Sequence, residues 1–286
     1  MARKEDPFGL RACNLRRLRQ NEDDAEARKL RLKPSRVTAW TTLIAQVAKN
    51  VVARGKPCDY EPWKNALADY SRKPSKLDEL SANDNCVSAD LVNFAADVAQ
   101  PGWPEPRPDL IEYALTFLEA DVMLFRSGYV KRHLIRRLQQ SELDCLQVSR
   151  VDMLLRRAVI HGTGLEECRA FRKLAAHLCT LGHLAELPRW LERKAEGAIL
   201  TLDRADGALW KKMIESPGLS ERDKKLLASV SFFRPSKWGI VYPEMNKVVR
   251  ARKAVKEPSE KVKYSAFLML TAIDRREISD EIRRAC

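Results

Sequence analysis

Apolar residues recur every three or four positions along most of the chain, which is the spacing of one face of an α-helix. The clearest stretch is residues 35–57, SRVTAWTTLIAQVAKNVVARGKP, and its periodic apolar residues are Val37, Trp40, Ile44, Val47, Val51 and Val52. Gly55 and Pro57 close the pattern, as expected at the end of a helix. The same periodicity predicts helices over residues 109–126, 129–140, 148–161, 165–181, 184–198, 205–215, 220–230, 244–256 and 260–272.

Patterns typical of strands are nearly absent. The exception is residues 231–243, SFFRPSKWGIVYP, which the prolines and glycine predict to be a structured loop or a short extended piece. Two stretches have the spacing of a helix-capping box, Thr163 to Glu166 and Ser220 to Asp223. The sequence therefore predicts an all-α fold.

A proline-rich stretch separates two parts of the chain. Residues 101–108, PGWPEPRP, cannot be helical and favour a stiff, extended connector. We expect residues 1–100 to form a smaller N-terminal helical module with a basic N-terminal segment, and residues 109–286 to form a larger basic helical domain. The short connections in the second part favour antiparallel neighbours. They suit a multi-helix array that is either solenoid-like or an irregular bundle.

The chain is strongly basic, and its charge is unevenly distributed. It has 52 Lys and Arg against 39 Asp and Glu, a formal net charge of +13. Residues 1–57 carry 14 − 6 = +8, residues 58–120 carry 5 − 12 = −7, residues 121–216 carry 17 − 12 = +5 and residues 217–286 carry 16 − 9 = +7. This balance favours a polyanionic partner, which is a nucleic acid, an anionic membrane surface or an acidic protein.

Cysteine usage and the absence of long apolar runs indicate the cellular compartment in which we expect the protein. The seven cysteines are odd in number, widely spaced and without a C-x-x-C pair, which argues against a disulfide framework. The first residues lack an apolar stretch of signal-peptide length. No run of about 18 apolar residues exists, so no membrane span is expected. We expect a cytoplasmic or nuclear protein that is not secreted.

Two predicted helices place arginines opposite an apolar stripe. In residues 129–138 the stripe is Val130, Leu134, Ile135 and Leu138, with Arg132 and Arg136 on the other side. In residues 148–161 the stripe is Val151, Leu155, Ala158 and Val159, and the arginines together on the other side are Arg150 and Arg157. Residues 126–140 contain no acid, whereas a solvated face normally mixes signs. Phosphate contact by these four arginines and a solvated or internally paired role both remain open.

A second basic segment combines cations with aromatic rings. Stacking on aromatic rings together with contacts to the backbone charge is how proteins hold single-stranded nucleic acid. The alternative is that the rings anchor a loop to the core. The candidate residues of this segment are Arg234, Lys237, Trp238, Lys247, Arg250, Arg252 and Lys253.

Catalytic and metal-binding patterns give no convincing site. Cys168, His177, Cys179 and His183 lie within sixteen residues, but their C-x8-H-x-C-x3-H spacing matches no usual zinc pattern. His133 and Arg136 share the H-x-x-R spacing of tyrosine recombinases, without the other residues of that family's site. There is no phosphate-binding glycine loop and no nucleophile elbow. We expect no cofactor, no metal and no enzymatic activity.

Two functions follow as hypotheses. The first is a non-enzymatic protein that binds RNA or DNA and contacts the phosphates through basic helices. A packaging or nucleocapsid-type protein fits this description. The second is a helical scaffold or adaptor that binds an acidic protein partner. Self-association is compatible with either.

Overall fold

The computed structural model describes residues 28–55, 60–71, 87–100, 107–124, 126–161, 165–196 and 257–285. Every regular element in these ranges is a helix, so the predicted all-α fold is confirmed for this part of the chain. The chain divides into two compact units, residues 1–134 (unit 1) and residues 135–286 (unit 2).

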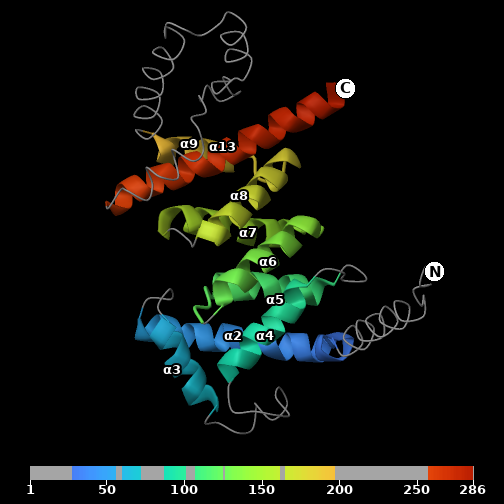
Figure 1. Cartoon of the computed structure of the whole chain (residues 1–286), viewed down its shortest axis with the longest axis vertical. Coiled ribbons are helices and arrows are strands. Elements are labelled where there is room, and N and C mark those ends of the chain that lie inside the picture. The colour runs from blue at the N-terminus through green and yellow to red at the C-terminus, as the bar shows by residue number, and fades with distance from the viewer. Residues whose placement is uncertain are drawn as a thin grey trace, which may run out of the picture. The chain divides into compact units, whose positions relative to one another are not determined.

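Unit 1 is built on α2 (Pro34–Arg54), α3 (Tyr60–Ser71), α4 (Val87–Ala99) and α5 (Pro108–Glu119). Helix α2 packs against α3 and α5, and α4 packs against α3 and α5 (Figure 1). Both α2 and α5 begin with a proline in the first turn, where its missing N–H costs no hydrogen bond. Helix α2 ends as predicted at Gly55, whose N–H donates to the carbonyl of Val51 at 3.1 Å.

The core of unit 1 contains a row of aromatic rings. Trp40 of α2 stacks on Phe94 of α4 with ring centroids 5.4 Å apart. Phe94 meets the edge of Tyr113 of α5 at 5.2 Å, and Tyr113 lies 6.0 Å from Phe117. All four side chains are buried. Rings of this size supply much of the apolar area that holds three helices together.

Arg107 fixes the start of α5 to the segment before α2. Its guanidinium donates to both carboxylate oxygens of Asp109, at 2.9 and 2.5 Å, and to the carbonyl of Leu32 at 2.8 Å. The hydrogen bond to Asp109 raises the pKa of Arg107. The guanidinium therefore links the first turn of α5 to backbone that lies 75 residues earlier.

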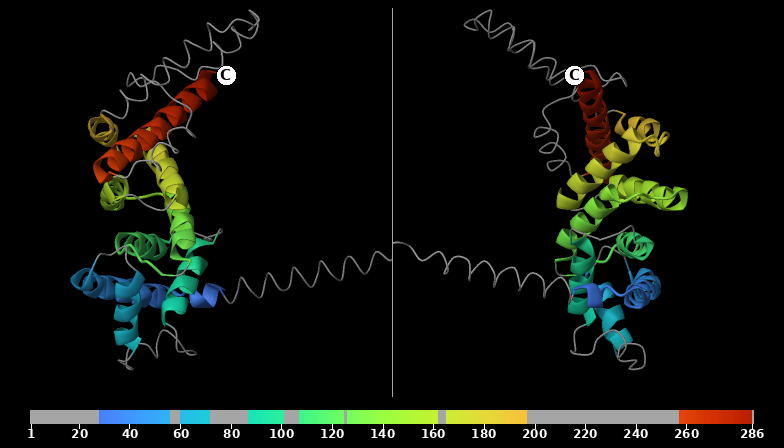
Figure 2. Two further views of the ribbon diagram at one scale, coloured as in Figure 1. Left: turned by 60° about the vertical axis from the view of Figure 1, so that its left-hand side comes forward. Right: turned by 90° about the vertical axis from the view of Figure 1, so that its right-hand side faces the viewer.

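Unit 2 contains α7 (Cys145–His161), α8 (Leu165–Thr180), α9 (Leu187–Ala195) and α13 (Pro258–Ala285). Helix α13 packs against α8, α9 and α7, and α7 packs against α8. Figure 2 shows α13 lying beside α8 and α9, although more than sixty residues separate it from them in sequence. Buried apolar residues of α13, including Phe267, Leu270 and Ile273, make its side of the core.

Helix α6 (Ser127–Gln140) contains the division between the units, which falls between Leu134 and Ile135. The predicted connector at 101–108 is not the division found here. Helix α4 before it and α5 after it contact each other within unit 1. Residues 101–106 lie outside the described residues, so an extended connector there stays a prediction.

The predicted helix over residues 35–57 is confirmed with one change to its core. Val52 is 62% exposed and lies outside the core, whereas Leu43, which the pattern did not include, is 2% exposed and belongs to it. The helices predicted over 205–215, 220–230 and 244–256, the loop at 231–243 and the capping boxes at Thr163 and Ser220 involve residues outside the described ranges.

Candidate functional site

The apolar stripe predicted for α6 is buried. Val130 is 7% exposed, and Leu134, Ile135 and Leu138 are 0% exposed. Arg132 and Arg136, the two candidate phosphate contacts, are both half-buried. The division between units passes between these two arginines, so each is assigned to its own unit.

Two other cations of α6 are engaged within the protein. The ammonium of Lys131 donates to Oδ1 of Asp121 at 2.5 Å, and the lysine side chain is 3% exposed. Arg137 donates to Oε1 of Gln140 at 2.7 Å. Partial burial lowers the pKa of Arg137. The charge of this acid-free stretch is thus smaller at the surface than the sequence indicates.

The inner face of α7 is confirmed by burial. Val151, Leu155, Ala158 and Val159, the predicted stripe, are at most 5% exposed. Arg150 and Arg157 lie two turns apart on the helix and are half-buried. Their relation to the other candidate cations is not tested by the described residues.

Arg156 has a structural role. Its Nε donates to Oδ2 of Asp152 at 2.7 Å, and its guanidinium lies 5.0 Å from the ring centroid of Trp190 on α9. The ammonium of Lys194 lies 5.8 Å from the same ring. Contacts of a cation with an indole ring are favourable. The contact between Arg156 and Trp190 therefore helps to hold α9 near α7.

The outer face of α7 carries large apolar side chains that the sequence reasoning missed. Leu146 is 74% exposed, Met153 is 61% exposed and Ile160 is 46% exposed. These three residues, which we call the α7 ridge, are spaced seven positions apart. Because seven residues fall about 20° short of two helical turns, the ridge runs nearly straight along the helix. The seven-residue spacing can be seen in the sequence, but the three residues lie outside the buried stripe.

Arginines accompany the α7 ridge. At about 100° per residue, Arg150 and Arg157 fall within about 80° of all three ridge residues. Asp152 is the one acid within α7, and it lies on the side of Arg156, about 120° from Leu146 and about 80° from Ile160. We call the ridge together with Arg150 and Arg157 the α7 outer face. It combines apolar contact area with positive charge.

The first turn of α7 is fixed by a reciprocal pair of hydrogen bonds. The N–H of Gln147 donates to Oδ1 of Asp144 at 2.8 Å, and the N–H of Asp144 donates to Oε1 of Gln147 at 3.1 Å. This is a capping box, which satisfies backbone donors that a helix start leaves without partners. It positions Leu146, the first residue of the ridge.

The candidate residues of the C-terminal basic segment cannot be placed. They are Arg234, Lys237, Trp238, Lys247, Arg250, Arg252 and Lys253, and all lie outside the described residues. Their convergence with the arginines of α6 or α7 therefore stays a prediction.

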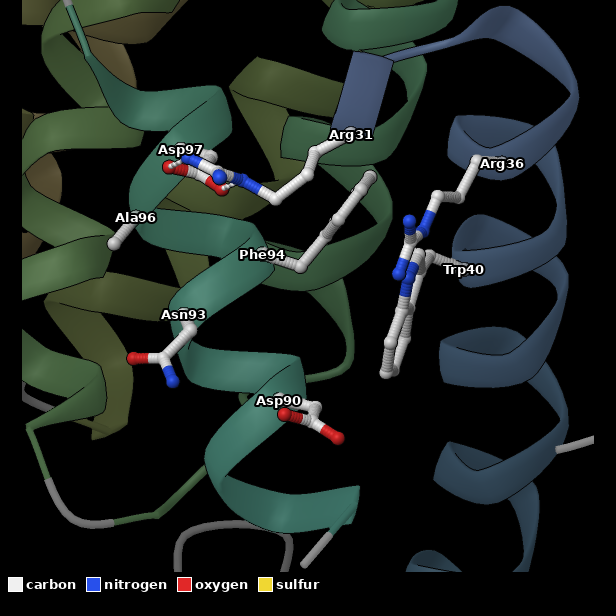
Figure 3. A pocket seen from close by; sticks show the side chains of 8 residues that line it. All are labelled: Arg31, Arg36, Trp40, Asp90, Asn93, Phe94, Ala96 and Asp97. Atoms are coloured by element: carbon white, nitrogen blue, oxygen red, sulfur yellow. Dashed lines mark hydrogen bonds and ion pairs between the residues drawn. The ribbon is translucent and has the colours of Figure 1, made fainter. Parts of the chain in front are cut away.

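Unit 1 has a cavity of about 410 Å³ between the start of α2 and α4. Figure 3 shows the stacked rings of Trp40 and Phe94 at one side of it, with Asp90, Asn93 and Asp97 along α4. Arg31 donates to both carboxylate oxygens of Asp97, at 2.6 and 3.3 Å. The lining of the cavity contains two arginines and two aspartates, so these charges balance. The polar lining joins the two helices and favours neither an anion nor a cation.

Cys168, His177 and Cys179 of α8 and His183 after it do not form a metal centre with the other described residues. In the described ranges no three His, Cys, Asp or Glu side chains are grouped to hold a metal ion. Cys145, Cys168 and Cys179 are free thiols. Burial lowers the pKa of His177, and Arg276 and His183 lower it further, whereas Asp280 raises it.

None of the described helices is both long enough and apolar enough to cross a membrane. No family model matches the chain, and no curated protein or solved structure is significantly similar to it.

Proposed function

We propose that the protein is a helical adaptor that binds an acidic protein partner through the α7 outer face. The observation that carries this proposal is the exposure of Leu146, Met153 and Ile160, which are 74%, 61% and 46% exposed, at heptad spacing. Single exposed apolar residues are ordinary, whereas a contiguous exposed apolar patch marks an interaction surface, and the ridge is our candidate for the apolar part of one. The free thiols described above support a reducing compartment, the cytoplasm or the nucleus, for this function.

The residue types of the α7 outer face favour protein over phosphate. Methionine and arginine are enriched at the centres of protein interfaces, where apolar contact supplies energy and arginine supplies directed hydrogen bonds. Interfaces with nucleic acid are more polar, and phosphate contact draws on Lys, Arg and small polar side chains. A leucine, a methionine and an isoleucine in line would gain little from a phosphate backbone.

A photo-crosslinking amino acid at Ser149 tests this function. Ser149 is exposed beside the ridge, so replacing it leaves the ridge and its arginines intact. The full chain would be expressed in its own cells and irradiated. We expect an adduct that protease destroys and nuclease does not. The matched control carries the same group at Lys173, an exposed residue of α8. A nuclease-sensitive adduct at 149, or equal protein adducts at both positions, would contradict the adaptor function.

Nucleic-acid binding is the second candidate, and one observation favours it. The net charge is +13, and residues 126–140 contain arginines and a lysine but no acid. Neutralising phosphates releases counterions, so log K would fall linearly with log of the salt concentration. Titrating labelled single- and double-stranded nucleic acid at several salt concentrations measures this slope. Arg132→Glu with Arg136→Glu should weaken binding to all sequences alike. Weak binding at 50 mM salt, or a flat salt dependence, would remove this candidate.

A further inference from the structure

We infer that the cavity between α2 and α4 of unit 1 binds a small uncharged molecule that carries a carboxamide-like group on an apolar body. The observation that carries this inference is the buried indole N–H of Trp40, a side chain that lines the cavity, because this donor has no acceptor among the described residues. The site lies in unit 1 and is independent of the adaptor function proposed for α7, which belongs to unit 2.

The cavity exists because α2 and α4 meet through side chains. Both helices pack on α3 and α5, and the stacked rings of Trp40 and Phe94 bridge them. A second bridge is the ion pair between Arg31, just before α2, and Asp97 of α4. Beside these contacts a space of about 410 Å³ is left. Sites for small molecules typically have volumes of roughly 300–1,000 Å³, so the cavity is large enough for a small ligand.

The indole N–H of Trp40 requires an acceptor. Trp40 is 1% exposed, and its Nε1 is buried without a hydrogen-bond partner in the described part of the chain. A buried donor without an acceptor is unfavourable and rare in folded proteins. Trp63 of α3 has a second buried indole N–H of this kind, but Trp63 does not line the cavity. A ligand in the cavity can therefore supply an acceptor to Trp40 and not to Trp63.

The charges of the lining select an uncharged ligand. Arg31 already donates to both carboxylate oxygens of Asp97. Arg36 and Asp90 also have interactions within the chain. A charged ligand would lose its hydration and meet equal numbers of positive and negative groups, so the cost of desolvating it would not be offset.

The ligand needs a donor as well as an acceptor. Asp90 lies one turn before Phe94 on α4 and lines the same cavity. A carboxylate oxygen can accept more than one hydrogen bond, so Asp90 can accept from a ligand N–H and keep its interaction within the chain. The carbonyl oxygen and N–H of a carboxamide or lactam supply both groups without a charge. Phe94 and Ala96 in the lining offer contact to the apolar body.

Arg36 controls access to the indole. It is half-buried one turn before Trp40 on α2, and Figure 3 shows its guanidinium beside the indole. Side chains change rotamer much faster than helices move. Rotation of Arg36 away from the ring would uncover Nε1 of Trp40 without separating α2 from α4.

NMR of the full chain labelled with nitrogen-15 tryptophan tests the inference, because each of the six tryptophans has one indole N–H. The probe is benzamide, which joins an aromatic ring to a carboxamide. We expect benzamide to move the signal of Trp40 downfield in a saturable way, since a hydrogen bond deshields the proton, and to leave the signal of Trp63 in place. An unchanged Trp40 signal up to the solubility limit of benzamide, or equal movement of both signals, would overturn the inference.

Three matched ligands test the chemical class. Benzoate has an anion in place of the amide, benzylamine has a cation, and toluene has no hydrogen-bonding group. We expect each to bind at least about fivefold more weakly than benzamide, the effect of losing one hydrogen bond. Comparable affinity of benzoate or benzylamine would overturn the assignment of an uncharged ligand. Comparable affinity of toluene would overturn the hydrogen bond to Trp40.

A variant that fills the cavity locates the site. Ala96 is half-buried in the lining, so Ala96→Leu places extra volume there without disturbing the core, and it should weaken benzamide binding at least about fivefold. The matched control is Ala53→Leu, at an exposed alanine of α2 outside the lining. If the control weakens binding as much as Ala96→Leu, benzamide does not bind in this cavity.

Trp40→Phe tests the hydrogen bond itself. It keeps a ring against Phe94 and removes the N–H. Binding is then followed by the line width of the ligand's own signals, and the remaining indole signals show whether the variant is folded. We expect a folded variant to lose affinity for benzamide and to keep its affinity for toluene. Unchanged affinity for benzamide, or an equal loss for both ligands, would contradict the role of Trp40.

Discussion

Lys131 and Asp121 form an ion pair in which the two partners differ sharply in burial. The lysine side chain is 3% exposed and the aspartate side chain is 30% exposed. The ammonium also lies 3.5 Å from Sδ of Met123. Asp121 has a positive φ of 49°, a conformation that aspartate tolerates better than most residues. The backbone turn before α6 thus presents a carboxylate to a lysine that would otherwise be buried without a counter-charge.

Removing either partner of this pair should have unequal effects. Asp121→Asn keeps the tolerance for positive φ but leaves a buried ammonium without its counter-charge. We expect it to lower the free energy of unfolding by about 2 kcal/mol, less than the ~3–5 kcal/mol of a fully buried pair, because Asp121 is partly hydrated. Lys131→Met should cost less, since it removes the buried charge itself. Urea denaturation of both variants measures the difference, and equal losses would contradict it.

Tyr113 buries a hydroxyl for which the described residues provide no hydrogen-bond partner. Its side chain is 0% exposed, and burial raises its pKa well above the ordinary value. Tyr113→Phe removes the hydroxyl and keeps the ring against Phe94. We expect the free energy of unfolding to rise by about 1 kcal/mol, because a buried polar group without a partner is destabilising. A loss of stability in denaturant melts would show that the hydroxyl has a partner after all.

The capping box of α7 makes a prediction about helix stability. Asp144→Ala removes the acceptor for the N–H of Gln147 and should cost about 1 kcal/mol. Asp144→Ser retains an oxygen at the same place and should cost much less. Hydrogen exchange at the first turn of α7 gives a local readout, with faster exchange expected in the alanine variant. Similar exchange in both variants would rule out the cap as its cause.

His177 should make unit 2 sensitive to acid. Its pKa is lowered in the folded state from 6.5, mainly by burial and then by Arg276 and His183. The unfolded chain therefore binds the proton more readily. The stability contributed by neutral His177 is present above pH ~6.5 and is lost as the pH falls below that value. His177→Gln should flatten the fall in unfolding free energy between pH 7.5 and pH 5.

The neighbour that lowers the pKa of His177 can be tested separately. Arg276 donates to Oδ2 of Asp280 at 2.9 Å. Arg276→Gln removes a positive charge near the imidazole. The carboxylate of Asp280, which raises the pKa of His177, stays and loses its ion-pair partner, so the pKa of His177 should rise. An NMR titration of the imidazole protons follows it directly. An unchanged midpoint would show that Arg276 does not lower the pKa of His177.

Most helix positions after residue 108 and their core stripes followed from periodicity, because a buried helix face needs apolar residues every three to four positions. The pattern did not predict α3 or α4, and the helix predicted over residues 109–126 ends at Glu119. Val130, Leu134, Ile135 and Leu138 were correctly predicted to be buried. Lys131 shows where this reasoning ends. A lysine beside the stripe is expected in water, and its burial depends on a carboxylate ten residues earlier in a turn that periodicity does not describe.

The capping box shows a different limit. The sequence predicted capping boxes at Thr163 and Ser220, whereas the described residues contain one at Asp144 and Gln147, which has the same three-residue spacing. Polar residues at this spacing are common, so the pattern alone does not choose among them. The ridge was not predicted, for a related reason. Apolar residues outside the main stripe do not indicate a surface by themselves, and only the exposure of Met153 shows that it lies on the outside of the helix.

The position of the unit division inside α6 restricts how this gene can be cut or recombined. A breakpoint in the proline-rich stretch would separate α5 from α2 and α4, with which it packs. A breakpoint between Leu134 and Ile135 would split one helix and divide its buried stripe between two products. A breakpoint in residues 141–144 keeps α2, α4, α5 and α6 on one fragment and α7, α8, α9 and α13 on the other, so it separates none of these packed helices within a unit.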